Sequence, residues 1–141
     1  MSLITPDIED VLNTGDRLVH LVTLARDGRP TATIVWSGVE DGEIVFAHLG
    51  EHQKVKNIRN DGRVVLSVVT GGKNEHGLDN YLVVEGTARI TEGGAPELLQ
   101  RLAQRYVGPG LKFPPMDNPP AGFITRVTPT KIGGIGPWTA G

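Results

Sequence analysis

The sequence predicts one mainly β domain with short helices, in which six or so antiparallel strands close into a small barrel. Runs rich in Val, Ile and Thr alternate with turns that contain Gly and Asp, and only two or three short segments show helical spacing. The 141 residues fit a single domain, 1–141, without internal repeats. Barrel closure is expected because it removes exposed sheet edges.

Composition excludes several classes of function. The chain has no cysteine, so disulfides, thiolate nucleophiles and Cys-ligated metals are absent. Its 14 basic and 16 acidic residues give a net charge of −2, which argues against nucleic-acid binding. No apolar run approaches the ~20 residues that span a bilayer, and the N-terminus does not resemble a signal peptide. We therefore expect a cytoplasmic protein with no membrane or nucleic-acid partner.

The first half of the chain predicts a helix followed by an antiparallel meander. Thr5 and Pro6 begin the helix and Gly15 ends it. Three strands are expected to follow the helix, and the second of them, residues 31–37, is expected to pair with the third, residues 43–47, across a turn at Asp41–Gly42. The three strands are residues 17–25, 31–37 and 43–47.

The second half predicts three more strands and one longer helix. Gly86 inside one strand indicates a bulge, and the polar, glycine-rich residues 71–80 are expected to form a loop at the rim, a candidate lid. The tail after residue 131 is expected to be flexible because of its glycines. The predicted elements are strands 64–69, 81–90 and 123–131, a helix over 95–107, and an irregular Pro- and Gly-rich segment over 108–121.

The chain is organised around residues 43–69. An apolar strand leads through a short basic linker into a helix that carries Lys54, Lys56 and Arg59 and ends at Asp61. Cationic side chains and free backbone N–H groups thus meet where a strand feeds a helix start, which favours a seat for phosphate or another anion. The alternative is a solvated basic helix face that only keeps the domain soluble.

A few large aromatic residues offer flat surfaces that could flank a planar ring system. Ordinary core or interface packing is the commoner role of such residues and stays open at this point. Together with a local anion seat, they would suit a flat cofactor that bears phosphate. These residues are Trp36, Phe46, Tyr81 and Trp138.

Two motifs of catalytic appearance do not carry a function. His48, Glu51 and His52 match the H-x-x-E-H pattern of zinc peptidases, but the pattern follows a strand, contains Gly50 and lacks a third ligand downstream. We therefore expect no metal site. No serine lies in a G-x-S-x-G elbow, and no residue is singled out as catalytic.

The order of several stretches resembles the pyridoxamine 5'-phosphate oxidase-like split β-barrel superfamily, the FMN-binding-protein-like fold, along nearly the whole chain. Within it the chain is similar to small oxidoreductases that use the deazaflavin coenzyme F420. The most telling stretches are KVKNIRNDGRVVLSV and the ending GPW, and the others are DGRP, TATIVW, YLVVEGTARI and RVTPTKIGGI.

The resemblance implies a homodimer with two cofactor sites at the subunit interface and a small-molecule substrate. It places a cofactor phosphate on Lys54, supported by the start of the following helix and by Asn57, and it places the ring along the strand that ends at Trp36, largely on backbone groups. The cofactor-binding residues that it implies are His48, His52, Gln53, Lys54, Val55, Asn57, Thr33, Ile34, Val35, Trp36 and Trp138.

The implied activity is transfer of a hydride from reduced F420 to a small electron-poor organic acceptor. Many relatives carry an arginine two residues before the lysine, whereas this chain has His52. The tail GIGPW lacks the arginine-bearing motif of true pyridoxamine phosphate oxidases, so the resemblance does not extend to that activity. An FMN-dependent oxidase or reductase on the same barrel, and a cofactor-binding protein without turnover, remain as alternatives.

Overall fold

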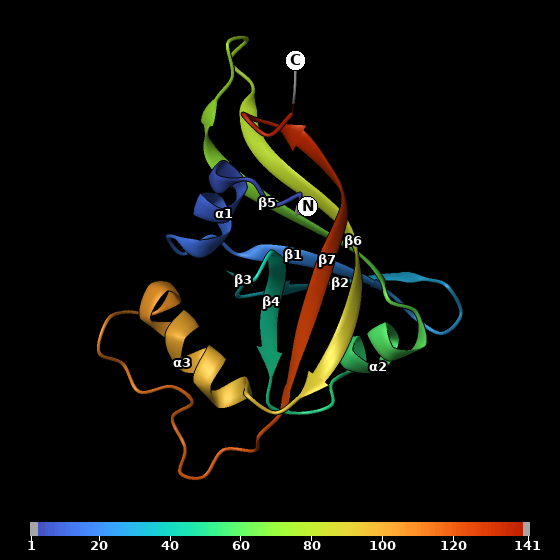
Figure 1. Ribbon diagram of the computed structural model, residues 1–141, viewed down its shortest axis with the longest axis vertical. Helices are drawn as coiled ribbons and strands as arrows, with labels where there is room; N and C mark the ends of the chain where they lie inside the picture. The colour runs from blue at the N-terminus through green and yellow to red at the C-terminus, as the bar shows by residue number, and fades with distance from the viewer. Residues whose placement is uncertain (1–2, 140–141) are drawn as a thin grey trace.

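A computed structural model describes residues 3–139, in which seven strands and three short helices form one mainly β unit (Figure 1). This confirms the predicted fold class. In chain order the elements are α1 (Pro6–Asn13), β1 (Val19–Leu24), β2 (Pro30–Val35), β3 (Gly38–Glu40), β4 (Glu43–His48), α2 (Gln53–Asn60), β5 (Arg63–Lys73), β6 (Asp79–Glu92), α3 (Ala95–Tyr106) and β7 (Phe123–Ile135).

The strands form one antiparallel sheet whose order forces it to curl. Neighbouring strands follow the order β2-β1-β5-β6-β7-β4-β3, so β2 and β3 lie at opposite ends of the sheet. Only Trp36 and Ser37 separate these two strands in the chain. Because this connection spans about 10 Å at most, the two ends of the sheet must lie close together, and the sheet curls into a barrel.

The predicted pairing of 31–37 with 43–47 is wrong. β2 pairs with β1, and the short β3, which the sequence did not reveal, pairs with β4. The chain bends between them because the backbone N–H of Ser37 donates to the Tyr106 hydroxyl and its carbonyl accepts from Arg105, at 3.2 and 3.0 Å. Side chains of α3 thus replace the strand partners of this corner.

The three helices lie where the sequence predicts them, two of them from apolar spacing. In α1 the buried residues are Ile8 and Leu12, and in α3 Leu98 and Leu102 face inward. None of the helices within residues 3–139 combines the length and the apolar character needed to cross a bilayer. Figure 1 shows α3 beside β4 and α2 on the other side of the barrel.

The core divides into two clusters of buried side chains. The larger one fills the barrel and includes Phe46, which is 1% exposed and is therefore a core residue rather than part of a ring-binding surface. The smaller one packs α3 against the sheet through Leu98 and Leu102, with Trp36 and Tyr106 at its edge.

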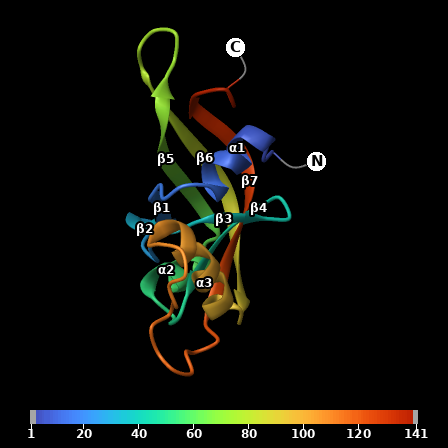
Figure 2. The same ribbon diagram turned by 90° about the vertical axis from the view of Figure 1, so that its left-hand side faces the viewer.

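Residues 71–80 form a hairpin instead of the predicted loop. β5 extends to Lys73 and β6 begins at Asp79, and these two residues form an ion pair at 2.6 Å. The Asn74 side chain accepts the N–H groups of His76 and Leu78 and so closes a tight turn. The hairpin projects beyond the barrel (Figure 2). Local turn chemistry therefore overrides the polar composition of this stretch.

The tail is likewise more regular than predicted. β7 continues to Ile135, and Gly133 and Gly134 pair with Val83 and Leu82 of β6. Gly134 adopts φ +100°, and a Cβ atom there would collide with the carbonyl oxygen of Tyr81. Gly134 thus permits close strand pairing, and both glycines lie in a paired strand instead of a flexible tail.

The predicted bulge at Gly86 is confirmed. The register between β6 and β7 shifts between Glu85 and Gly86, where the two strands approach closely. A Cβ atom on Gly86 would lie 2.7 Å from both the Thr128 carbonyl oxygen and the Val127 Cγ1 atom. Glycine is therefore required at position 86 because a side chain would collide with β7, and not because of a positive φ angle.

We predict that Gly86→Ala lowers the free energy of unfolding by about 1 to 3 kcal/mol, because the added methyl group must displace a neighbouring strand. Urea denaturation measures this value. Gly108→Ala is the matched control, since a Cβ atom there meets no heavy atom within 4 Å. Equal stability of the two variants would contradict the close approach of β6 and β7.

Candidate functional site

An open cavity of about 250 Å³ lies where β2 ends. The sheet, α2, α3 and the segment after α3 surround it. Six of its seven lining residues are apolar, and the seventh is Lys54. The cavity brings together four of the residues that the resemblance implies, from the end of β2 and from α2. Its lining consists of Ile34, Val35, Trp36, Ala47, Lys54, Leu99 and Phe113.

Lys54 supplies a positive charge at this cavity. It is the second residue of α2 and is half-buried, and this burial lowers the pKa of its ammonium group below the ordinary value. Within residues 3–139 no carboxylate lies within ion-pair distance of its Nζ atom, and no hydrogen bond satisfies it. A partly dehydrated ammonium group without a partner favours an anion in the cavity.

The start of α2 adds to this preference. The first turn carries no acidic residue, and the N-cap residue His52 makes no side-chain hydrogen bond to the helix. The positive end of the helix dipole is therefore not neutralised by a side chain of its own first turn. Lys54 and the helix start thus act in the same direction on an anion.

Asn57 points into the protein. Its side-chain amide donates to the hydroxyls of Thr23 and Thr31 at 3.1 and 3.3 Å, and its Oδ1 atom accepts from Gln53 at 2.8 Å. Asn57 is 2% exposed. This network fixes α2 to the β1–β2 hairpin and commits both donors of the amide, which leaves neither for a ligand.

His48 lies at the end of β4 and is 3% exposed. Its Nε2 atom is 2.7 Å from the Thr125 hydroxyl, and its ring meets Phe46 edge-on. Burial, followed by the nearby charges of Lys54 and His52, lowers the pKa of His48 to about 3. The imidazole is therefore neutral at physiological pH and serves as a buried polar contact between β4 and β7.

The H-x-x-E-H residues do not share a helix face. His48 belongs to β4, whereas Glu51 and His52 precede α2. The Glu51 carboxylate pairs with Arg59 at 2.5 Å. A zinc peptidase needs both imidazoles and the carboxylate on one helix, so this geometry does not match.

Other residues implied by the resemblance lie outside the cavity lining. Val55 is fully buried, so only its backbone is available to a ligand, while Thr33 is exposed on β2. Gln53 and His52 are exposed at the start of α2. Trp138 packs against the main core, and the segment after β7 lies at the opposite end of the barrel from α2 (Figure 1).

Three cavity residues were not predicted as site residues: Ala47, which the sequence placed only in a strand, Leu99 and Phe113. Leu99 lies beside the buried face of α3 and is half-buried, so the helical spacing placed it with the core residues. Phe113 belongs to an irregular segment without periodicity, and nothing in the sequence links it to Trp36. An aromatic residue in a Pro-rich connection is the only available signal.

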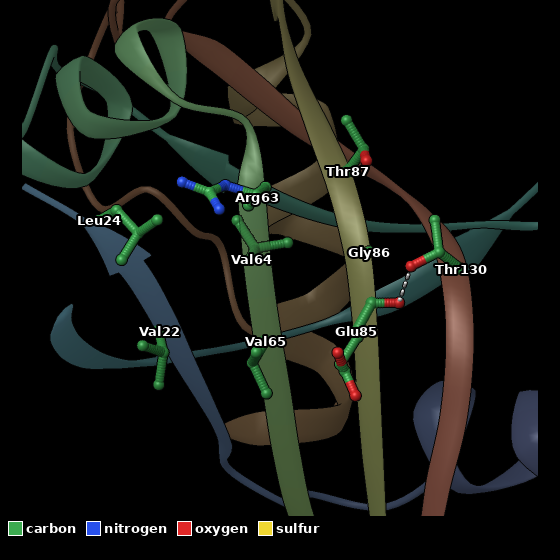
Figure 3. A pocket seen from close by; sticks show the side chains of 9 residues that line it. All are labelled: Val22, Leu24, Arg63, Val64, Val65, Glu85, Gly86, Thr87 and Thr130. Carbon is green, nitrogen blue, oxygen red and sulfur yellow. Dashed lines mark hydrogen bonds between the residues drawn. The ribbon is translucent and has the colours of Figure 1, made fainter. Parts of the chain in front are cut away.

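A second cavity, of about 290 Å³, opens at the bulge of β6 (Figure 3). Figure 3 shows Val22 and Leu24 on one side and Thr130 on the other, where the Thr130 hydroxyl donates to the Glu85 carbonyl oxygen. Arg63 also lines this second cavity, but its guanidinium group is already paired with the Asp61 carboxylate at 2.7 Å. This cavity therefore lacks the uncommitted cation that distinguishes the Lys54 cavity.

The sequence matches the profile described as pyridoxamine 5'-phosphate oxidase over residues 4–135. The chain belongs to this family. The match covers the whole barrel, including β2, α2 and β7. Among curated proteins, no sequence matches significantly.

Solved structures resemble this family member along most of its length. An F420 reductase is 25% identical, with a TM-score of 0.71 and coverage of 92% of this chain and 98% of the other. A conserved hypothetical protein from Mycobacterium tuberculosis is 27% identical, with a TM-score of 0.66 and coverage of 89% and 80%. General stress protein 26 from Bacillus anthracis, at 21% identity, TM-score 0.58 and coverage of 86% and 85%, shares the fold.

We predict that His48 makes the fold sensitive to acid. The pKa of His48 is about 3 in the folded chain, whereas an ordinary histidine has a pKa of 6.5, so below pH 6.5 the unfolded chain binds a proton that the folded chain does not. The contribution of the neutral imidazole to the free energy of unfolding is fully present above pH 6.5. Below that pH it falls by at most about 1.4 kcal/mol per pH unit, down to the pKa of His48 in the folded chain.

Urea denaturation between pH 6.5 and 4.5 tests this for wild type and for His48→Gln, which keeps a polar group opposite Thr125 but does not titrate. We expect the variant to lose roughly 1 to 3 kcal/mol less than wild type over this range. His20→Gln, at an exposed position of β1, is the control. Equal pH slopes for wild type and His48→Gln would show that the imidazole is not held neutral.

Proposed function

We propose that this protein is a reductase that binds the reduced deazaflavin coenzyme F420 and transfers a hydride to a small electron-poor organic acceptor. The observation that carries the proposal is the unpaired ammonium group of Lys54 in an otherwise apolar cavity beside Trp36. The 25% identity with an F420 reductase over 92% of this chain supports the choice of cofactor.

The residues present suit a flat ring with a charged substituent. Lys54 and the start of α2 would hold the anionic group, whereas Ile34 and Trp36 offer apolar surface to the ring. β2 is an end strand of the sheet, so backbone N–H and C=O groups along its outer edge have no strand partner. Such groups can bond the polar edge of a ring. Asn57 has no part in this proposal, because its donors are committed.

The chemistry asks little of the side chains. When bound, a reduced deazaflavin supplies the hydride, which adds to an electron-poor carbon of the acceptor. The chain has to hold the two reactants face to face and keep the cavity apolar. Among the described residues Lys54 is the only titratable group in the cavity lining, so the proton that completes the reduction is supplied by water or by the Lys54 ammonium group.

FMN is the second candidate cofactor, because the family to which the chain belongs is that of pyridoxamine 5'-phosphate oxidase. A flavin phosphate presents the same two features, a flat ring and an anion. Both proposals therefore use the same cavity. A protein that binds either cofactor without turnover is the remaining alternative.

Parallel titration of the purified protein with F420 and with FMN tests the proposal. We expect saturable binding of F420 that is tighter than that of FMN, followed by oxidation of reduced F420 when an electron-poor alkene is supplied. Tighter binding of FMN would favour the flavin enzyme. Binding without oxidation by any acceptor would favour the storage protein, and absence of binding would refute all three.

We predict that Lys54→Ala weakens binding of the preferred cofactor about tenfold or more, because a charge-assisted contact contributes roughly 1.5 to 3 kcal/mol. The same titration measures it. Lys56→Ala is the matched control, since Lys56 is exposed on the same helix and does not line the cavity. If both variants bind equally well, Lys54 does not hold the anion.

We further propose that the protein is a homodimer that covers the outer face of β1, β5 and β6. Two directly paired positions on this face are apolar on both strands, since Val22 faces Val65 and Val69 faces Tyr81, whereas Val65 also faces Glu85 of β6. Val69 is 67% exposed. Ile34, on the next strand, is 54% exposed and also lines the cavity, so the face continues to its opening. A partner there would enclose a cofactor too large for the cavity alone.

We predict that Val65→Glu converts the dimer into a monomer, because it would bury a second carboxylate in the interface, directly opposite Glu85. Light scattering after size exclusion measures the mass. Val107→Glu, at the exposed residue that follows α3, should leave the dimer intact. A wild-type monomer, or a dimer that tolerates Val65→Glu, would contradict this interface.

A further inference from the structure

The wall of the Lys54 cavity opposite the sheet comes from α3 and from the irregular segment 107–122. Leu99 projects from the helix, and Phe113 from the segment. The other lining residues belong to β2, its adjoining corner, β4 and α2, which the sheet and the buried Asn57 network hold in place. Phe113 is thus the lining residue that comes from the long irregular segment, whereas Trp36 lies in the two-residue corner between β2 and β3.

Two glutamines of α3 fix this segment. Gln100 and Gln104 lie one helical turn apart, and both side-chain Nε2 atoms donate to the carbonyl oxygen of Leu111 at 2.8 Å. Their Oε1 atoms accept backbone N–H groups, from Gly110 to Gln104 at 2.7 Å and from Phe113 to Gln100 at 2.6 Å. We call these four hydrogen bonds the glutamine clamp. Through them the two side chains supply hydrogen-bond partners to backbone groups of the irregular segment, and the position of Phe113 is thereby fixed.

Trp36 is the fixed surface that Phe113 faces. Its ring stacks on Tyr106 with 5.4 Å between centroids and 8° between planes. The Tyr106 hydroxyl donates to the Arg17 carbonyl oxygen at 2.7 Å, so the stacked pair is anchored. The Phe113 ring lies 5.3 Å from Trp36 at an angle of 54°. The two tilted rings therefore form two different walls of the cavity.

We propose that Leu99 and Phe113 form the acceptor side of the cavity and that Phe113 determines the size of the flat, apolar, ring-containing acceptor that enters. The identity of the bound ring as a hydride acceptor rests on the proposed function. The size limit set by Phe113 rests only on the cavity and on the glutamine clamp. The substrate class follows from the lining, which offers apolar surface and no polar side chain except Lys54.

Binding of planar probes tests the size limit without any cofactor. The series is benzoate, naphthalene-2-carboxylate and anthracene-2-carboxylate, in which one carboxylate for Lys54 is combined with one, two or three fused rings. The readout is quenching of Trp36 fluorescence in a Trp138→Phe background, because the chain has two tryptophans.

We expect Phe113→Ala to raise the affinity for the three-ring probe relative to benzoate about tenfold or more, because the lost ring opens the wall. Phe113→Leu should give an intermediate ratio and shows whether the effect is graded. Gln100→Ala combined with Gln104→Ala should shift the ratio in the same direction with the Phe113 ring retained. Met116→Ala, on the same segment but 45% exposed and outside the cavity lining, should leave the ratio within about twofold.

An unchanged ratio in Phe113→Ala, or the same change in Met116→Ala, would overturn the role of Phe113. Absence of Trp36 quenching by all three probes in the Trp138→Phe variant without further changes would show that the cavity does not take flat rings. Lys54→Ala should weaken all three probes by one common factor, since it removes the anion seat and not the wall. A failure of cofactor binding would refute the proposed function and leave this size test intact.

With turnover established, the same variants report on the acceptor itself. The ratio of kcat/KM for a three-ring to a one-ring cyclic enone should rise in Phe113→Ala in parallel with the probe ratio. If the probe ratio rises and the kinetic ratio does not, Phe113 lines the cofactor side of the cavity and the assignment to the acceptor is wrong.

Discussion

The corner at Trp36 and Ser37 is the constraint on which the rest of the structure depends. It joins the two end strands of the sheet, so barrel closure and the position of the cavity are decided by the same two residues. Ser37 is fully buried, and its backbone groups bond to Tyr106 and Arg105 of α3. Because buried backbone groups need partners, α3 has to dock at this corner. The docked helix then carries Phe113 to the cavity through its glutamines.

The electrostatic design of the site follows from this arrangement. The buried amide of Asn57 fixes α2 to the sheet. Lys54, in the first turn of α2, lines the cavity, and no carboxylate among the described residues pairs with it. Near it, His48 is kept neutral by burial. One cation therefore meets a ligand in apolar surroundings, where its attraction for an anion is stronger than in water. The cavity at Gly86 is similar in volume, but its guanidinium group is already neutralised by Asp61.

Local sequence signals predicted elements more reliably than partners. Pro6, Gly86 and the apolar spacing of α3 act over a few residues, and the helices and the bulge were found at these positions. The pairing of 31–37 was wrong, because it depends on a hydroxyl from Tyr106, about 70 positions along the chain. The tip around Asn74 looked like a loop by composition, although its side chain closes a tight hairpin.

The sequence by itself determined the mainly β class, the strand-to-helix junction that carries Lys54, and the family, because these depend on short-range patterns and on the order of motifs. Only the tertiary structure decided that Asn57 points inward, that Trp138 packs at the far end of the barrel, and that Phe113 faces Trp36. These outcomes depend on contacts between distant segments. The physical reason is that the direction of a side chain depends on which elements pack around it, and that packing is decided by the tertiary fold.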